Sequence, residues 1–70
     1  MDRIAVQSSN ICSVGYDAVT STLEIEFRSG SIYQYLDVAE SEFDGLMGAA
    51  SKGRHLNQQI KCRYRYHQIR

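Results

Sequence analysis

The run of residues 22–36 constrains the fold most, because apolar and polar side chains alternate with period two before Gly30 and a second strand-like run follows it. Residues 22–28 have the pattern of a strand with one buried face. Its inward residues are Leu23, Ile25 and Phe27. Residues 31–36 then carry two tyrosines in a second β-like run. The sequence therefore predicts a β-hairpin here.

The Ser29-Gly30 turn decides which way Tyr33 and Tyr35 face. A two-residue loop of type I′ needs positive φ at Ser29, and type II′ needs the glycine first, so neither suits this order. A type I turn that closes with Gly30 in the left-handed region, as a G1 bulge, suits both residues. We expect the bulge, which pairs Ile25 with Tyr33 and turns both tyrosines to the core. The two-residue loop would turn them outward instead.

Near the carboxyl end, residues 61–67 alternate in a similar way. Successive side chains of a strand point to opposite faces, and tyrosine forms strands better than helices, so a half-buried strand is predicted. Its inward face consists of Cys62, Tyr64 and Tyr66. Its outward face is a basic stripe of Lys61, Arg63, Arg65 and His67.

Two further strands are predicted near the amino terminus. Ile4 and Val6 alternate with polar residues, and Ser8-Ser9-Asn10 is typical of a turn whose short side chains bond the backbone. Residues 11–16 form a second β-like run. In that run we expect one face to be shared by Cys12, Val14 and Tyr16.

A helix is predicted after the hairpin. Asp37 as N-cap and Glu40 at N3 have the spacing of a capping box. The apolar stripe that follows at helical spacing consists of Phe43, Leu46, Met47 and Ala50. Gly53 suits the position just after the helix end. One or two further helical turns would point Leu56 and Ile60 inward.

The order of strands, helix and strand predicts an α+β fold. We expect one domain over residues 1–70, with an antiparallel β-sheet of four to five strands. A β-meander comes first, one main α-helix then packs on one face of the sheet, and a C-terminal strand closes the chain.

Charge is unevenly distributed although the formal net charge is zero. Residues 1–50 hold all eight acids and only Arg3 and Arg28 as cations, whereas residues 51–70 hold six cations and no acid. This asymmetry indicates contact with a polyanion, or else a basic tail packed beside acidic strands. No run resembles a signal peptide or a membrane span, so we expect a cytoplasmic protein with no membrane contact and reduced thiols at Cys12 and Cys62. A structural disulfide between them is the alternative if the chain is exported.

An ordered set of segments resembles the KTSC family. The set consists of Val6-Gln7-Ser8-Ser9-Asn10-Ile11, Val14-Gly15-Tyr16-Asp17, residues 23–30, Tyr33-Gln34-Tyr35, Ala50-Ser51-Lys52-Gly53 and Asn57-Gln58-Gln59-Ile60-Lys61. The central Tyr-x-Tyr is the family's mark, and the resemblance runs from about Val6 to Ile69. Ala39 stands where the family's helix start is expected to carry proline.

These are short domains named for the C-terminal extension of some lysyl-tRNA synthetases, and they also occur as free-standing bacterial and phage proteins. The resemblance implies a domain whose function is described as unknown and for which RNA binding has been proposed.

Catalysis and metal binding find little support. The only histidines are His55 and His67, and no Ser/His/Asp or Cys/His grouping has a recognisable spacing. Cys62 and His67 have opposite parity on the predicted strand, so their side chains should diverge. His55, Cys62 and His67 do not have the spacing of zinc ligands. We expect a protein that is not an enzyme and has no cofactor or metal.

RNA binding takes a definite form in this chain. A guanidinium group can donate two parallel hydrogen bonds to one phosphate, and it can also stack on a base. Lys52 and Arg54 lie near the predicted stripe. The predicted nucleic-acid-binding residues are Lys52, Arg54, Lys61, Arg63, Arg65 and His67. The predicted partner is RNA, either tRNA-like or single-stranded.

The alternative is a protein-interaction or homo-oligomerisation module, as a monomer or weak homodimer. If the bulge forms, Ile32 and Leu36 lie on the outer sheet face, where an exposed edge can receive a partner strand or subunit. Self-association without a salt-sensitive RNA interaction would favour this alternative.

Overall fold

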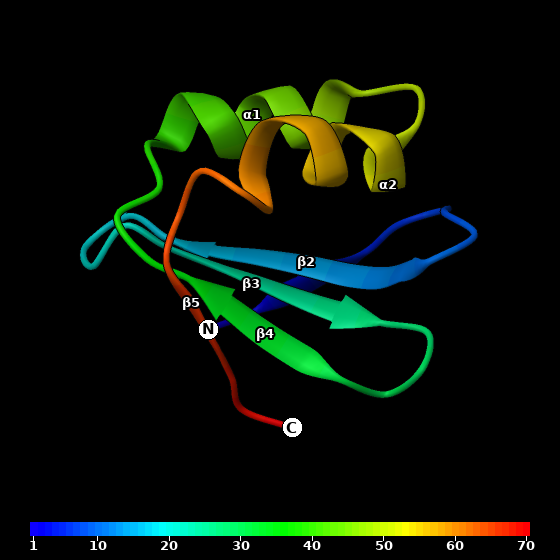
Figure 1. The fold of residues 1–70 in the computed structure, drawn as a ribbon, viewed down its shortest axis with the longest axis horizontal. Coiled ribbons are helices and arrows are strands. Elements are labelled where there is room, and N and C mark those ends of the chain that lie inside the picture. The colour runs from blue at the N-terminus through cyan, green and yellow to red at the C-terminus, as the bar shows by residue number, and fades with distance from the viewer.

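The computed structural model describes residues 1–70 as a five-stranded antiparallel sheet with helices over one face (Figure 1). The strands, in spatial order β1-β2-β3-β4-β5, are Arg3–Ala5, Ile11–Asp17, Thr22–Phe27, Ile32–Tyr35 and Tyr66–Gln68. The helices are α1 Glu40–Gly48, α2 Lys52–His55 and the π-helix η1 Leu56–Ile60. The predicted α+β class is therefore confirmed.

The β3–β4 hairpin has the predicted bulge. Gly30 adopts a φ of +98°, in the left-handed region that glycine tolerates. Ile25 lies opposite Tyr33, and Leu23 lies opposite Tyr35. Both tyrosines consequently face the helices, Tyr35 at 2% exposure and Tyr33 half-buried.

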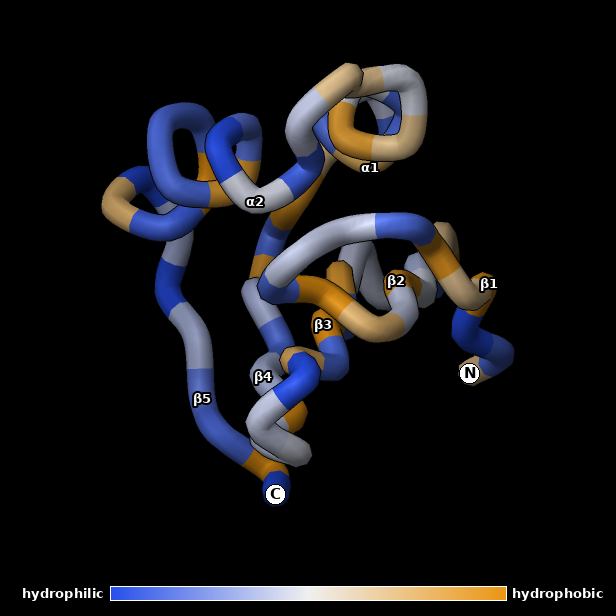
Figure 2. Tube along the Cα trace, turned by 90° about the vertical axis from the view of Figure 1, so that its right-hand side faces the viewer, coloured by the Kyte–Doolittle hydropathy of each residue, from blue (hydrophilic) through white to orange (hydrophobic).

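Nine buried residues from both layers form the core. They are Ile11, Val14, Leu23, Ile25, Tyr35, Val38, Leu46, Leu56 and Ile60. Figure 2 shows the helices above the strands, with hydrophobic stretches of β2 and β3 at the centre of the molecule. The predicted inward positions of Leu46, Leu56 and Ile60 are confirmed. None of the helices combines the length and apolarity needed to cross a membrane.

Helix α1 begins later than the capping box predicts. Asp37 has a φ of +57°, so it cannot cap a helix that starts at the next residue. Ala39 is the N-cap instead, without a side-chain hydrogen bond, and α1 starts at Glu40. The φ of −66° and ψ of 147° at Ala39 are angles that proline also adopts.

The helical layer also breaks where a continuous helix was predicted. α1 ends at Gly48, so Ala50 is exposed and not part of the apolar stripe. Gly53 does not end the helix but lies inside α2. The Ser51 hydroxyl accepts the Arg54 N–H at 3.4 Å and caps this new helix. Glycine in the last turn of α1 weakens it, and the serine cap favours a restart.

The predicted strand over residues 61–67 is largely wrong, because its first part is helical. The Lys61 N–H donates to the Leu56 carbonyl at 2.8 Å, and the Arg63 N–H donates to the Ile60 carbonyl at 3.1 Å. Leu56 and Ile60 are buried at helical spacing, and their packing overrides the local alternation. Strand β5 begins only at Tyr66.

The three side chains predicted to point inward from the tail have different positions. Cys62 is exposed, which contradicts the prediction. Tyr64 packs against the core and donates its hydroxyl to the Glu42 carboxylate at 3.0 Å. Burial, together with this hydrogen bond, raises the pKa of Tyr64. Tyr66 contacts the helix-facing tyrosines, but it is 54% exposed because β5 is an edge strand.

A second bulge changes the inward face of β2. The register shifts between Ile11 and Ser13, so Ile11 is fully buried whereas Cys12 is only partly buried. Val14 is buried as predicted. Ile4, on the edge strand β1, is 56% exposed and does not reach the core.

Candidate nucleic-acid interface

A groove lies between the end of the β3–β4 hairpin and the helical segment that follows α2. It consists of two adjoining pockets of about 320 and 410 Å³. Phe27, Ser29 and Lys61 line both pockets, so the two share a wall. Each pocket has a different chemical character.

The larger pocket, called here the tyrosine pocket, is aromatic. Its lining residues are Phe27, Ser29, Ser31, Tyr33, Tyr35, Lys61 and Tyr66. The Tyr33 ring meets Phe27 edge-on with centroids 5.5 Å apart and stacks on Tyr66 at 5.4 Å. Since Tyr66 comes from β5, this pocket exists only because the tail returns to pair with β4.

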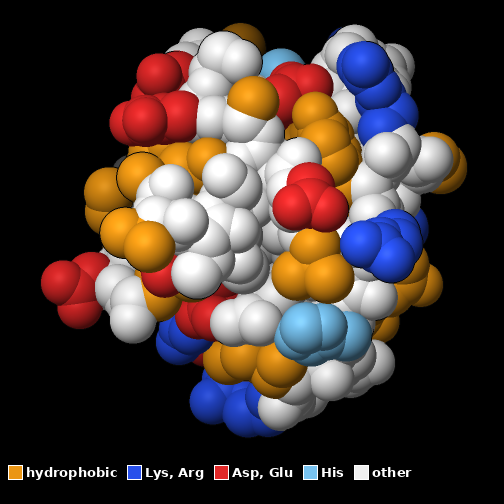
Figure 3. Space-filling view, turned by 90° about the vertical axis from the view of Figure 1, so that its left-hand side faces the viewer, with side chains coloured by type: hydrophobic (Ala, Val, Ile, Leu, Met, Phe, Trp, Pro, Cys, Tyr) orange, Lys and Arg blue, Asp and Glu red, His pale blue; other side chains and the backbone are white.

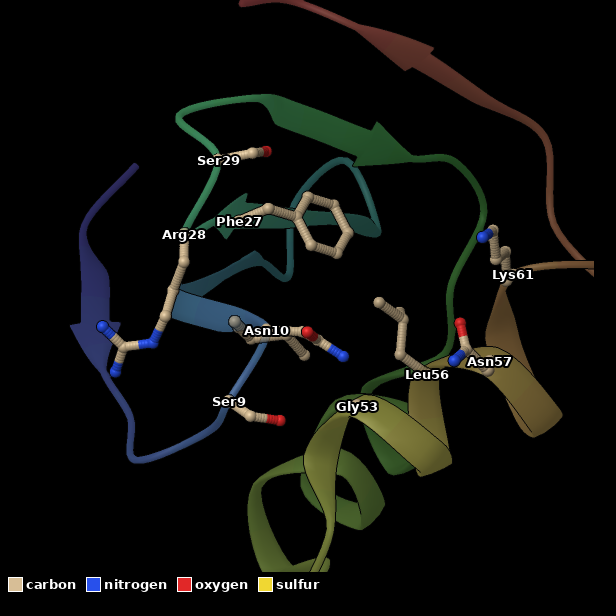
Figure 4. Close-up of a pocket in the computed structure, with 10 residues that line it drawn as sticks. Ser9, Asn10, Phe27, Arg28, Ser29, Gly53, Leu56, Asn57 and Lys61 are labelled. Carbon is tan, nitrogen blue, oxygen red and sulfur yellow. The ribbon is translucent and has the colours of Figure 1, made fainter.

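The smaller pocket, called here the amide pocket, is more polar. Its lining residues include Asn10 from the β1–β2 connection and Asn57 from η1, with Phe27 and Leu56 on its apolar side. Figure 4 shows Asn10, Asn57 and Lys61 extending toward the same space, whereas Arg28 turns away from it. The Arg28 guanidinium donates instead to the Ser8 carbonyl at 2.7 Å.

Lys61 is the predicted site residue that the structure brings to this groove. Its side chain is exposed, lines both pockets and forms no ion pair with a carboxylate. On the predicted strand, Lys61 lies on the face opposite the tyrosines. The helical turn at residues 61–63 places it beside them instead.

Three other predicted cations lie along the same helical segment. The Lys52 ammonium donates to the Ala49 carbonyl at 3.1 Å, and Arg63 donates to the Gln59 amide oxygen at 3.4 Å. Arg54 is exposed and makes no ion pair. None of these three lines the groove.

Arg65 and His67 do not continue a single basic stripe. Arg65 lies 3.8 Å from the Asp37 carboxylate, with both side chains exposed. His67 contacts the Gln34 amide at 2.9 Å, on the sheet face away from the helices. Figure 3 shows Lys and Arg side chains on this side of the molecule in separate groups, with acidic and uncharged atoms between them. The predicted stripe of four aligned cations is therefore wrong.

The sheet face away from the helices carries a polar network, called here the outer-face network. It consists of Arg3, Ser13, Glu24, Glu26, Gln34, His67 and Arg70. Arg3 forms an ion pair with Glu24, which also accepts a hydrogen bond from Gln34 at 2.8 Å. Glu26 accepts hydrogen bonds from Ser13 at 2.7 Å and from Arg70 at 3.0 Å.

These contacts change the acidity of both glutamates. Burial opposes ionisation of Glu24, but the hydrogen bonds from Gln34 and Arg3 outweigh it and lower the pKa of Glu24. The hydrogen bond from Ser13 is the main cause that lowers the pKa of Glu26. Both carboxylates are therefore held ionised by partners within the chain.

The apolar surface predicted for a protein partner is not open. Ile32 lies opposite Glu26 on the outer face, as predicted, but it is only 5% exposed. The chain end covers it, since the Ile32 N–H donates to the Arg70 carbonyl at 2.9 Å and the Ile69 N–H donates to the Ile32 carbonyl at 2.8 Å. Leu36 is half-buried.

The structure offers no group of three or more His, Cys, Asp or Glu side chains that could hold a metal ion. His55 lies beside Gly45 of α1, where its ring carbon is 3.4 Å from the position of an added Cβ. Its Nε2 atom is buried without a hydrogen-bond partner. One histidine between two packed helices gives no catalytic grouping.

Sequence segments that resemble the KTSC family meet at the groove, although they are far apart along the chain. They contribute Ser9, Asn10, Ser29, Gly53, Asn57 and Lys61 to the amide pocket and Tyr33 and Tyr35 to the tyrosine pocket. Asn10, Asn57 and Phe27 were not predicted as site residues from the sequence. Their grouping depends on how far the helices extend over the sheet, which no local pattern specifies.

Comparison with known proteins identifies the family. The KTSC domain model matches residues 7–64. An uncharacterised protein of Stutzerimonas stutzeri is 46% identical over 70 residues, covering 99% of both chains. The crystal structure of a KTSC domain protein from Yersinia pestis superimposes with a TM-score of 0.96 at 42% identity, covering 99% of this chain and 97% of that one. The chain therefore belongs to the KTSC domain family.

A similar sequence also occurs within much longer proteins. A lysine–tRNA ligase of Nostoc punctiforme is 41% identical over 63 residues, which is 90% of this chain but only 11% of the ligase. This chain thus corresponds to a small part of that enzyme.

Proposed function

We propose that this KTSC domain is a small non-catalytic module that binds RNA through the cations of residues 52–63 and the groove beside them. The observation that carries the proposal is the position of Lys61, an exposed ammonium group without a carboxylate partner on the wall shared by both pockets. Proteins that bind single-stranded nucleic acids combine cations with aromatic rings in this way.

The surrounding charge favours a polyanion. Residues 51–65 carry five cations, which are Lys52, Arg54, Lys61, Arg63 and Arg65, and no acid. Of these only Arg65 lies within 4 Å of a carboxylate. Phosphates that meet such free cations release counterions, so affinity falls as salt rises. His67 contributes less to this surface, because it lies on the other sheet face.

The ligase relatives point in the same direction. A segment similar to this chain forms part of lysine–tRNA ligases, whose name includes an RNA. This association supports RNA as the nucleic acid, with either a tRNA-like or a single-stranded region as the target.

Protein interaction is the alternative, and the structure leaves it less surface than the sequence predicted. Ile32 is covered by the chain end, so the predicted apolar face is closed. What remains is the edge strand β1, where Ile4 is 56% exposed. Only self-association or a protein ligand at this edge would support the alternative.

An NMR titration of the labelled domain tests the proposal. Short single-stranded and hairpin RNAs are added at two salt concentrations, and amide shifts are mapped onto the chain. We expect shifts at residues 52–63 that weaken with salt, and loss of binding in a Lys61→Glu/Arg63→Glu variant. Arg70→Gln, which removes a cation on the outer face, is the control and should bind normally. A titration without shifts at either salt concentration contradicts the proposal.

A further inference from the structure

The tyrosine pocket presents aromatic rings that the chain itself leaves partly uncovered. Tyr66 is 54% exposed although its ring stacks on Tyr33 at an interplanar angle of 29°. Phe27 stands edge-on to Tyr33 at 86°, so the ring planes form a corner and not a closed stack. An aromatic ring that enters such a corner gains contact with a face and an edge at once.

The polar groups of this pocket are also unpartnered. The hydroxyls of Tyr16 and Tyr64 have hydrogen-bond acceptors within the chain, whereas those of Tyr33, Tyr35 and Tyr66 have none. Burial raises the pKa of Tyr35 to about 12, so its hydroxyl stays a donor at physiological pH. Ligands with ring nitrogens and carbonyl oxygens can satisfy such donors.

The amide pocket next to it offers different polar groups that have no hydrogen-bond partner in the chain. The side-chain amides of Asn10 and Asn57 are exposed and form no hydrogen bond within the chain. Each amide offers two donors and one acceptor, the combination that reads the edges of bases. In single-stranded RNA those edges are free, whereas in an RNA helix the readable groove is largely closed to side chains.

The size of the two pockets and their shared wall also restrict the ligand. Pockets of about 320 and 410 Å³ lie at the lower end of ligand-pocket volumes, so each suits one ring system. The two pockets share Lys61, whose ammonium group has no anionic partner in the chain. A ligand with two rings joined through an anionic link matches this order of features.

We infer that the groove holds two successive nucleotides of a single RNA strand, an inference that rests on the RNA-binding function proposed above. One base packs against Tyr33 and Tyr66. The edge of the neighbouring base meets the amides of Asn10 and Asn57. The phosphate that joins the two nucleotides lies at the Lys61 ammonium.

Binding of octamers of A, U and C to single-residue variants tests the inference. Because the chain has no tryptophan and three of its five tyrosines line the tyrosine pocket, quenching of tyrosine fluorescence follows the binding of RNA there. Tyr66→Leu should weaken binding about tenfold with no change in the salt dependence, since it removes stacking but no charge. Tyr66→Phe should restore most of the affinity, because it restores the ring and lacks only the hydroxyl donor.

Two further variants separate phosphate contact from base contact. Lys61→Gln should reduce the salt slope by about 0.7, the contribution of one single-strand phosphate. Asn57→Ala should change the relative affinities for the three octamers. Gln58→Ala is the matched control, since Gln58 is its exposed neighbour on η1 but does not line the groove. Urea midpoints of all variants show that each is folded.

The outcomes distinguish this inference from the function on which it rests. The octamers can bind to the wild type and bind as tightly to Tyr66→Leu and Asn57→Ala. In that case the RNA binds to the cations outside the groove. The two-nucleotide site is then wrong and the RNA-binding function stands. If no RNA binds to the wild-type domain at any salt concentration, both proposals are wrong.

Discussion

The two faces of the sheet carry polar side chains in very different states. On the outer face, Arg3, Glu24 and Gln34 bond to one another, and the network extends to the chain end through Arg70. On the helix-facing side, the groove holds Asn10, Asn57 and Lys61 without side-chain partners. The outer-face network thus holds satisfied polar groups, whereas the groove holds unsatisfied ones.

This difference suggests a different role for each face. A hydrogen bond within the chain contributes only modestly to stability because it replaces bonds to water, whereas a broken buried network leaves a desolvated group behind at a larger cost. Groups that keep their bonds to water contribute little to folding and remain free for a ligand. We therefore expect substitutions on the outer face to change stability, and those at the groove rim to change binding.

The largest effect should come from Tyr35, an aromatic residue that belongs to both the groove and the core. Tyr35 lines the tyrosine pocket yet is only 2% exposed. Tyr35→Ala should lower the free energy of unfolding by about 3–5 kcal/mol, the scale of buried aromatic truncations. Urea denaturation measures it. Tyr35→Phe is the control and should cost little, because the hydroxyl has no partner in the chain; a large loss there would reveal a hidden bond.

The next largest effect is expected on the outer face. Arg3→Ala removes the cation from Glu24, whose side chain is 7% exposed. A buried group left without its partner costs about 1–3 kcal/mol, so the free energy of unfolding should fall by that amount. The matched variant Arg28→Ala, at an exposed residue that pairs with no acid, should change the urea midpoint less. A urea midpoint of Arg3→Ala equal to that of the wild type would mean that the network does not stabilise the fold.

Acid should weaken the same network in a predictable direction. The pKa values of Glu24 and Glu26 are lowered in the folded chain from the ordinary value of 4.5. Folding is therefore favoured by ionisation above that value, and this contribution is lost as pH falls through the lower folded-state values. Urea midpoints should decline as the pH is lowered from neutral to values below 4.5.

A glutamine substitution isolates the cause of that decline. Glu24→Gln should flatten the acid part of the profile, because the position no longer takes up a proton. Asp44→Asn, at an exposed carboxylate without a cation partner, provides the comparison. If both variants keep the wild-type slope, the network is not the source of the pH dependence.

Local chemistry was sufficient to predict the β3–β4 hairpin but not the groove. The Ser29-Gly30 order favours one turn geometry, and that geometry sets which face Tyr33 and Tyr35 occupy. The tail could not be predicted in the same way. Alternation over residues 61–67 indicates a strand. Leu56 and Ile60, however, are buried at helical spacing, and the helical hydrogen bonds continue into residues 61–63.

That continuation placed Lys61 beside the tyrosines and Cys62 in solvent, contrary to prediction. The helix start was missed for a similar reason. Asp37 fits a capping box by spacing, yet the chain needs a left-handed residue there to turn from β4 into the helical layer. In both cases a tertiary requirement decided between two locally acceptable structures.

The smallest stability effect is the most direct test of the contrast between the faces. A Lys61→Gln/Asn57→Ala variant changes two exposed groove residues whose side chains bond to nothing in the chain. Surface substitutions of this kind usually change stability by less than about 0.5 kcal/mol, so the urea midpoint should stay near that of the wild type. Octamer binding to the same variant should fall strongly, because a phosphate contact and a base contact are both lost. If the variant loses stability as Arg3→Ala does, the groove side chains belong to the fold, and the separation of roles between the two faces is wrong.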